Sequence, residues 1–237
     1  ASLQPDQRDE WCNAIEPLLR KIDQSGQPAL LETKKRCENF LEVASKLLNA
    51  PYPSFVEVHV INGNSLIRLG DQQAAEKEFR KALAMTQQTV GPAQPEVSAV
   101  ADALGHLFLN QQRYSEARDF FDLSLTVHLD ALGPEHPQTA RRYAQLAFSF
   151  MGLGDNASAY PLLVKELERR QQATSSDPRH LAICYAHLSI VSSDSGRYRE
   201  AEKYIRKSIG LLEQFGAQNS PDYVRARIRL ASSLEDQ

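Results

Sequence analysis

A period of about 42 residues runs through most of the chain and limits its fold more than any other feature. In each period an amphipathic segment is followed by a turn and a second apolar segment. Proline suits the first turn of a helix, where its missing N–H is not needed, and proline opens every period: Pro53, Pro95, Pro137, Pro178 and Pro221. Because one helical hairpin cannot bury its apolar face alone, we expect the pairs to stack into an array.

The period divides the chain into three predicted parts. Residues 1–52 do not keep the period, so we expect a divergent N-terminal helical hairpin that is a cap or a degenerate repeat. Its first helix would carry Trp11, and its second would run from Pro28 to about Asn49 with Leu30, Leu31 and Cys37 on the apolar face. The remainder is predicted to hold four repeats and then a terminal helix that is the start of an incomplete repeat or a cap: 53–94, 95–136, 137–177, 178–220 and 221–237.

Small residues recur at fixed places in each period. They lie in the first segment and again 12 residues later in the second, which predicts a close crossing of the two helices. The positions are Gly63, Gly105, Ala147 and Ser189, followed by Ala75, Ala117, Ala159 and Ala201. Glycines at 70, 154 and 196 are expected to close the first helices in the left-handed conformation.

Tyr143, Leu146, Ala147 and Phe150, followed by Ala159 and Leu163, resemble the tetratricopeptide repeat (TPR). The lengthened second helices, which end in Leu-Gly-Pro-Glu-His-Pro at 132–137, are similar to the kinesin light chain type of TPR. The resemblance covers about residues 53–237 and implies an all-α, right-handed superhelical solenoid of antiparallel helix pairs. HEAT and armadillo arrays, with similar periods, are the alternative. In TPR arrays the first helices line a concave groove that holds a peptide of a partner protein.

Helical spacing gives the residues expected on the groove side of the first helices. The TPR resemblance implies that a backbone-binding asparagine often precedes the small crossing residue by two positions; here those positions are Ile61, Ala103, Gln145, His187 and Arg229. Two arginines four residues apart project from one helix face and suit a carboxylate or a phosphate, between which the sequence does not choose. A solvated basic face or contact with a further repeat would give the same pattern. The predicted peptide-binding residues are Glu57, Asn64, Asp102, His106, Asn110, Arg141, Gln145, His187, Asp194, Arg225 and Arg229.

Composition and motifs exclude several classes of protein. A formal charge of −3 argues against binding to a nucleic-acid backbone, and no apolar run approaches the roughly 20 residues that span a bilayer. Three cysteines far apart in helical patterns favour a reducing, cytoplasmic setting. His180, Cys184 and His187 have metal-like spacing, but a buried structural Cys184 is the preferred interpretation. No phosphate loop or nucleophile elbow is present, so no catalytic residue, metal or cofactor is predicted.

These features predict a non-catalytic adaptor or scaffold that binds a protein or peptide, with an acidic segment as the ligand that the arginines suit. Two other classes remain open. One is a regulatory or sensor module whose groove is occupied by its own chain. The other is a self-assembly module that associates through the terminal helix or the N-terminal hairpin.

Overall fold

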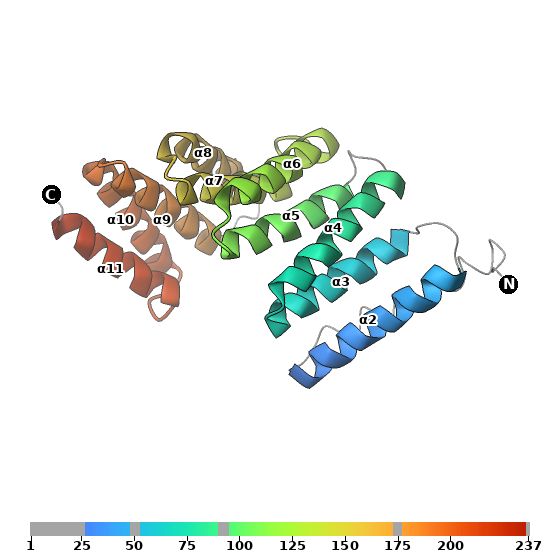
Figure 1. The fold of residues 1–237 in the computed structure, drawn as a ribbon. Coiled ribbons are helices and arrows are strands. Elements are labelled where there is room, and N and C mark those ends of the chain that lie inside the picture. The colour runs from blue at the N-terminus through green and yellow to red at the C-terminus, as the bar shows by residue number, and fades with distance from the viewer. Residues whose placement is uncertain (1–26, 48–52, 90–94, 173–176, 236–237) are drawn as a thin grey trace. The chain divides into compact units, whose positions relative to one another are not determined.

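The computed structural model describes residues 27–47, 53–89, 95–172 and 177–235, and every regular element in these ranges is a helix (Figure 1). The predicted first helix of the N-terminal hairpin, with Trp11, lies outside the described residues. The helices are α2 (Gln27–Leu47), α3 (Pro53–Leu69), α4 (Gln72–Thr89), α5 (Pro95–Asn110), α6 (Tyr114–Leu132), α7 (Pro137–Gly152), α8 (Asn156–Gln172), α9 (Pro178–Asp194), α10 (Tyr198–Gln214) and α11 (Pro221–Glu235).

The predicted helix starts and turns are confirmed. Five helices begin at the five periodic prolines: α3, α5, α7, α9 and α11. Gly70, Gly154 and Gly196 close three of the first helices with φ of 89°, 76° and 71°, a conformation that a side chain disfavours. Asp177 caps α9, where its carboxylate accepts a hydrogen bond from the Arg179 backbone N–H at 2.9 Å.

The chain forms two compact units, 1–111 and 112–237. In the first unit, α2 packs on α3, and α3 packs on α4. The Phe40 and Phe55 rings meet edge to face at 5.9 Å between centroids, which joins α2 to α3. Gly63 of α3 lies against the Phe79 ring of α4, since an added Cβ would be 2.6 Å from that ring. One expectation for α2 is wrong: Leu31 is 59% exposed, so it does not belong to the apolar face.

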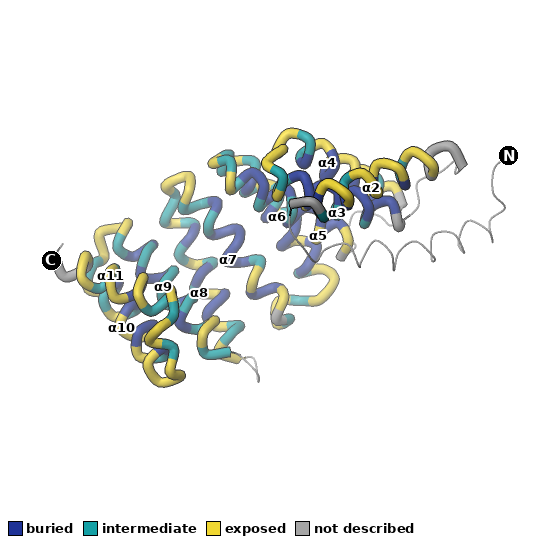
Figure 2. Tube along the Cα trace, turned by 90° about the horizontal axis from the view of Figure 1, so that it is seen from below, coloured by how far each residue is buried: buried dark blue, intermediate teal, exposed yellow. Residues whose placement is uncertain are grey.

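In the second unit each helix from α6 to α11 packs on the next, and α9 also contacts α11. Figure 2 shows the buried positions of α7, α8 and α9 along their mutual contacts. This core contains Ala147, Ala159 and Leu163, all fully buried, so the predicted small residues do occupy tightly packed positions. Free Cys184 is part of the same core, as predicted.

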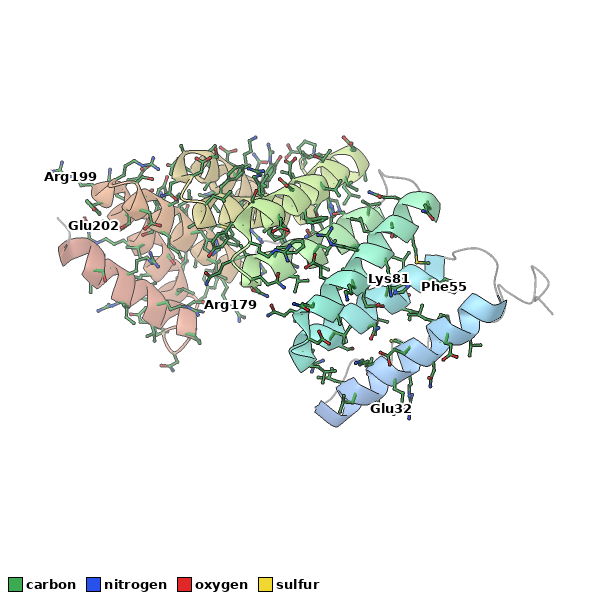
Figure 3. All side chains as sticks on the ribbon, in the orientation of Figure 1. Glu32, Phe55, Lys81, Arg179, Arg199 and Glu202 are labelled. Atoms are coloured by element: carbon green, nitrogen blue, oxygen red, sulfur yellow. The ribbon has the colours of Figure 1, made fainter. Side chains whose placement is uncertain are left out.

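Half-buried tyrosines connect α8 to α10 in the second unit. The Tyr160 hydroxyl donates to Glu200 Oε1 at 2.8 Å and lies 2.8 Å from the Tyr204 hydroxyl, while Arg197 covers the Tyr160 ring at 4.2 Å. Burial and these contacts raise the pKa of Tyr160. Charged side chains such as Arg199 occupy the outer face of α10 (Figure 3). The contacts of Tyr160 with Glu200 and Tyr204 therefore link α8 to α10, the second helices of successive pairs.

Candidate functional site

The predicted site residues of the first unit fall into two groups. Asn64 and Asn110 are exposed, whereas Glu57 and His106 are half-buried and Asp102 is only 9% exposed. Asp102 therefore presents little surface to a ligand. None of these five residues lines the cavity described below, which lies in the second unit.

A buried polar network that the sequence did not reveal lies between α3 and α4. His59 Nδ1 is 2.7 Å from Glu78 Oε2, Asn62 donates to the same oxygen at 3.2 Å, and Lys81 donates to Glu78 Oε1 at 2.8 Å. Burial by itself would raise the pKa of Glu78, but the hydrogen bonds from His59, Lys81 and Asn62 outweigh it and lower the pKa to about 2. Both carboxylate oxygens of Glu78 thus have donors, while Asn62 Oδ1 is buried without a partner among the described residues, and the network holds one helical hairpin together.

Three predicted site residues of the second unit lie apart from any described cavity. Arg141 and Asp194 are exposed, and Gln145 is only 3% exposed. Gln145 Oε1 accepts a hydrogen bond from Arg142 Nη1 at 3.1 Å. The position that matches the family's backbone-binding asparagine is therefore occupied in this repeat by a buried amide with an internal partner.

The three remaining predicted residues, His187, Arg225 and Arg229, line one cavity of about 230 Å³. We call it the α9–α11 pocket, because α9, α10 and α11 form its walls. Its lining is largely aliphatic, with a polar edge from α11 and His187. The lining residues are Ala182, Ile183, Ala186, His187, Ile190, Ile205, Ser208, Leu212, Asp222, Arg225, Ala226 and Arg229.

His187 has an unusual environment on the wall of this pocket. Its ring packs edge to face on Phe148 with 4.7 Å between centroids, and its buried Nδ1 has no hydrogen-bond partner among the described residues. Burial and the charges of Arg170 and Arg229 lower the pKa of His187 to about 4, while Asp222 acts in the opposite direction. The imidazole is therefore neutral at physiological pH and has a free nitrogen.

The arginines of the α9–α11 pocket differ in their pairing. Arg225 Nη2 donates to Asp222 Oδ1 at 2.6 Å, so its charge is compensated. Arg229 is half-buried and forms no hydrogen bond or ion pair with the described residues. Arg229 and His187 thus both line one largely apolar cavity, the guanidinium without a partner among the described residues and the imidazole with its Nδ1 buried. Sequence reasoning named both arginines but missed Asp222, which the spacing of three residues on a helix would have indicated.

A second buried carboxylate lies between α8 and α9, next to Cys184. Glu166 is 2% exposed; its Oε1 accepts from Arg170 Nε at 3.0 Å, and its Oε2 has no partner among the described residues. Burial raises the pKa of Glu166 even though Arg170 opposes the shift. Burial and the Glu166 charge also raise the pKa of Cys184, so this thiol is not an activated nucleophile. No group of metal-ligating side chains was found within the described residues.

Comparison with known proteins identifies the repeat. Family models of the tetratricopeptide repeat match residues 56–128 and 181–214. The chain contains tetratricopeptide repeats. Curated relatives are the clustered mitochondria protein homologs of Aspergillus fumigatus and Aspergillus niger, each 25% identical over 148 residues, or 62% of this chain. The chain covers only 11% and 12% of the length of these relatives.

Solved structures share the TPR-like solenoid fold. BtubC (BKLC) from P. vanneervenii matches with a TM-score of 0.73 and 16% identity over 87% of this chain and 80% of its own. A Podosopora anserina putative kinesin light chain with nearly identical TPR-like repeats matches with a TM-score of 0.73 and 17% identity, over 86% and 95%. These likenesses show the all-α fold. Among the described helices, none has the length and apolar character needed to cross a bilayer.

Proposed function

We propose that the chain is a non-catalytic protein-interaction module that binds a peptide segment of a partner protein in the α9–α11 pocket. TPR folds serve as protein-interaction modules in general, and the pocket is the cavity into which predicted ligand-binding residues converge. The observation that carries the proposal is Arg229, an unpaired guanidinium on an aliphatic wall. The segment we propose therefore contains an acidic residue.

The shape and chemistry of the pocket suit a short segment with one anchoring side chain. Ile183, Ile190 and Leu212 give apolar surface, and a volume of about 230 Å³ accommodates an aliphatic side chain. The walls are helices that are already folded, so little ordering of the receptor opposes binding. Affinity then depends on a few contacts, of which a charge-assisted hydrogen bond to Arg229 is the strongest.

Peptide selection followed by matched variants tests the proposal. Random dodecapeptides displayed on phage are selected against residues 1–237, and the selected peptides are labelled with fluorescein for anisotropy titrations. Arg229→Gln is expected to weaken their binding roughly tenfold, because it removes a hydrogen bond to a charged group. Arg227→Gln is the matched control, since Arg227 is exposed on the same helix and does not line the pocket.

Equal binding by the wild type and both variants would place the peptide site elsewhere on the chain. Circular dichroism of each variant checks that the helices remain folded. A loss confined to Arg229→Gln supports the pocket as the binding site.

A further inference from the structure

Asp222 lies on the pocket wall beside the basic groups that a ligand would meet. Its Oδ1 accepts the hydrogen bond from Arg225 Nη2 at 2.6 Å. Its charge also acts on His187, on the facing helix α9. Arg229 acts on the same imidazole with the opposite sign. One carboxylate of the protein therefore lies within electrostatic reach of the position that a ligand anion would take next to Arg229 and His187.

The charges on the pocket wall leave one positive charge without a partner. Asp222 compensates Arg225, and His187 is neutral, so Arg229 is the cation of the pocket lining that has no partner among the described residues. Resting on the function proposed above, we infer that Asp222 is a specificity residue: it makes the α9–α11 pocket select an aliphatic ligand group with a single negative charge and reject a doubly charged phosphate.

Simple electrostatics gives the direction of this selection. A carboxylate carries one charge, which Arg229 compensates. A phosphate monoester carries about two charges at neutral pH, and its second charge finds no free cation on the pocket wall, because Arg225 is already paired with Asp222. Because this pair is partly exposed, with side chains of Asp222 and Arg225 39% and 74% accessible, solvent weakens the discrimination without removing it. Phosphorylation of a bound segment is therefore expected to weaken binding at this pocket.

Three small probes of matched shape separate charge from apolar contact. They are 4-methylpentanoate, 3-methylbutyl phosphate and the neutral 4-methylpentanamide, each titrated near pH 7.5 into residues 1–237. The readout is the imidazole NMR resonance of His187, which lies on the pocket wall. The wild type is expected to bind the carboxylate more tightly than the phosphate or the amide.

Asp222→Asn is the decisive variant, because it frees the Arg225 guanidinium for a second ligand charge and keeps the side-chain shape. Its affinity for the phosphate is expected to rise roughly threefold more than its affinity for the carboxylate, the size expected for a partly exposed charge pair. Glu213→Gln is the matched control. It removes a carboxylate from α10 that accepts a hydrogen bond from the Tyr223 hydroxyl outside the pocket lining, so no change in either affinity is expected.

Three results would overturn the inference: tighter binding of phosphate by the wild type, equal gains for both anions in Asp222→Asn, or no response of His187 to any probe. Each leaves the proposed function standing if the selected peptides still depend on Arg229. Loss of that dependence is a failure of the proposed function itself.

Discussion

Two histidines on first helices, the buried His59 of the first unit and the half-buried His187 of the second, have opposite environments. His59 is 7% exposed and lies 2.7 Å from a carboxylate that two further donors also reach. His187 packs on an aromatic ring, faces a cavity, and has a buried nitrogen without a partner among the described residues. The same residue type is thus paired with a carboxylate in one hairpin, whereas in the other it lines a cavity with its Nδ1 buried and without a partner among the described residues.

The buried carboxylates of the two units show the same contrast. Glu78 receives hydrogen bonds from three side chains, and its pKa falls to about 2. Glu166 accepts a hydrogen bond from one arginine, and burial raises its pKa. Burial raises the pKa of both acids; at Glu78 the three donors outweigh burial, and at Glu166 burial outweighs the arginine. Both carboxylate oxygens of Glu78 have donors, whereas Glu166 Oε2 and His187 Nδ1 are buried without a partner among the described residues.

The largest expected effect comes from breaking the network around Glu78. Glu78→Gln removes the charge and places an amide N–H₂ against the donors His59 and Lys81. The free energy of unfolding is expected to fall by roughly 1–3 kcal/mol, as measured by urea denaturation followed by circular dichroism. Glu76→Gln removes a carboxylate that pairs with Arg80 on the same helix, and its effect should stay below about 0.5 kcal/mol. Similar losses in both variants would contradict the special role of the network.

The pH dependence of stability should separate the two regions. The pKa of His187 is about 4 in the fold against 6.5 in its absence, so the unfolded chain binds more protons between these values. Above pH 6.5 the protonation of His187 does not affect the free energy of unfolding. As pH falls from 6.5 toward 4, that free energy decreases, because the unfolded chain takes up the proton more readily. The pKa of Glu78 is about 2 in the fold against 4.5, so its contribution is present above pH 4.5 and is lost toward pH 2.

Urea midpoints measured from pH 7 to pH 2.5 check both windows. His187→Gln is expected to flatten the curve between pH 6.5 and 4, and Glu78→Gln to flatten it below pH 4.5. A His187→Gln curve that keeps the wild-type slope in the upper window would contradict the buried, neutral imidazole.

The smallest expected effect compares packing around two helical glycines. A Cβ at Gly210 of α10 meets nothing within 4 Å, so Gly210→Ala should stabilise the chain by about 0.5–1 kcal/mol through helix propensity. Gly63→Ala gains the same propensity, but the new methyl would be 2.6 Å from the fully buried Phe79 ring, and the variant should be destabilised. Thermal unfolding of both variants measures the difference; a rise in melting temperature at both positions would mean that the Gly63 contact relaxes easily.

Much of the local structure could be predicted because it repeats. The prolines that open the helices, the turn glycines and the buried alanines at 75, 159 and 201 all follow from the period, and the structure confirms each of them. The spacing of the apolar residues predicts which face of each helix is apolar, and neighbouring helices pack against each other through that face.

The contacts within the candidate site were harder to predict from the sequence. His59 and Glu78 are 19 residues apart on different helices, so their contact depends on how α3 is rotated against α4, which the period does not specify. Asp102 and Gln145 have polar side chains at predicted groove positions but are buried. His187 and Arg229 converge because α9 packs directly on α11. Helical spacing predicts on which face of its helix a residue lies, whereas how deeply that residue is buried depends on the neighbouring helices.

The turn at Gln112 has a left-handed backbone conformation although it contains no glycine. The turn after α5 has no glycine, and Gln112 adopts φ of 59° where the other three turns of this kind have Gly70, Gly154 and Gly196 in the same left-handed region. Such a conformation disfavours a residue with a side chain. The turn after α5 therefore has the backbone geometry of the glycine turns without a glycine, which means that the shape of the hairpin is set by the packed helices and not by the residue that joins them.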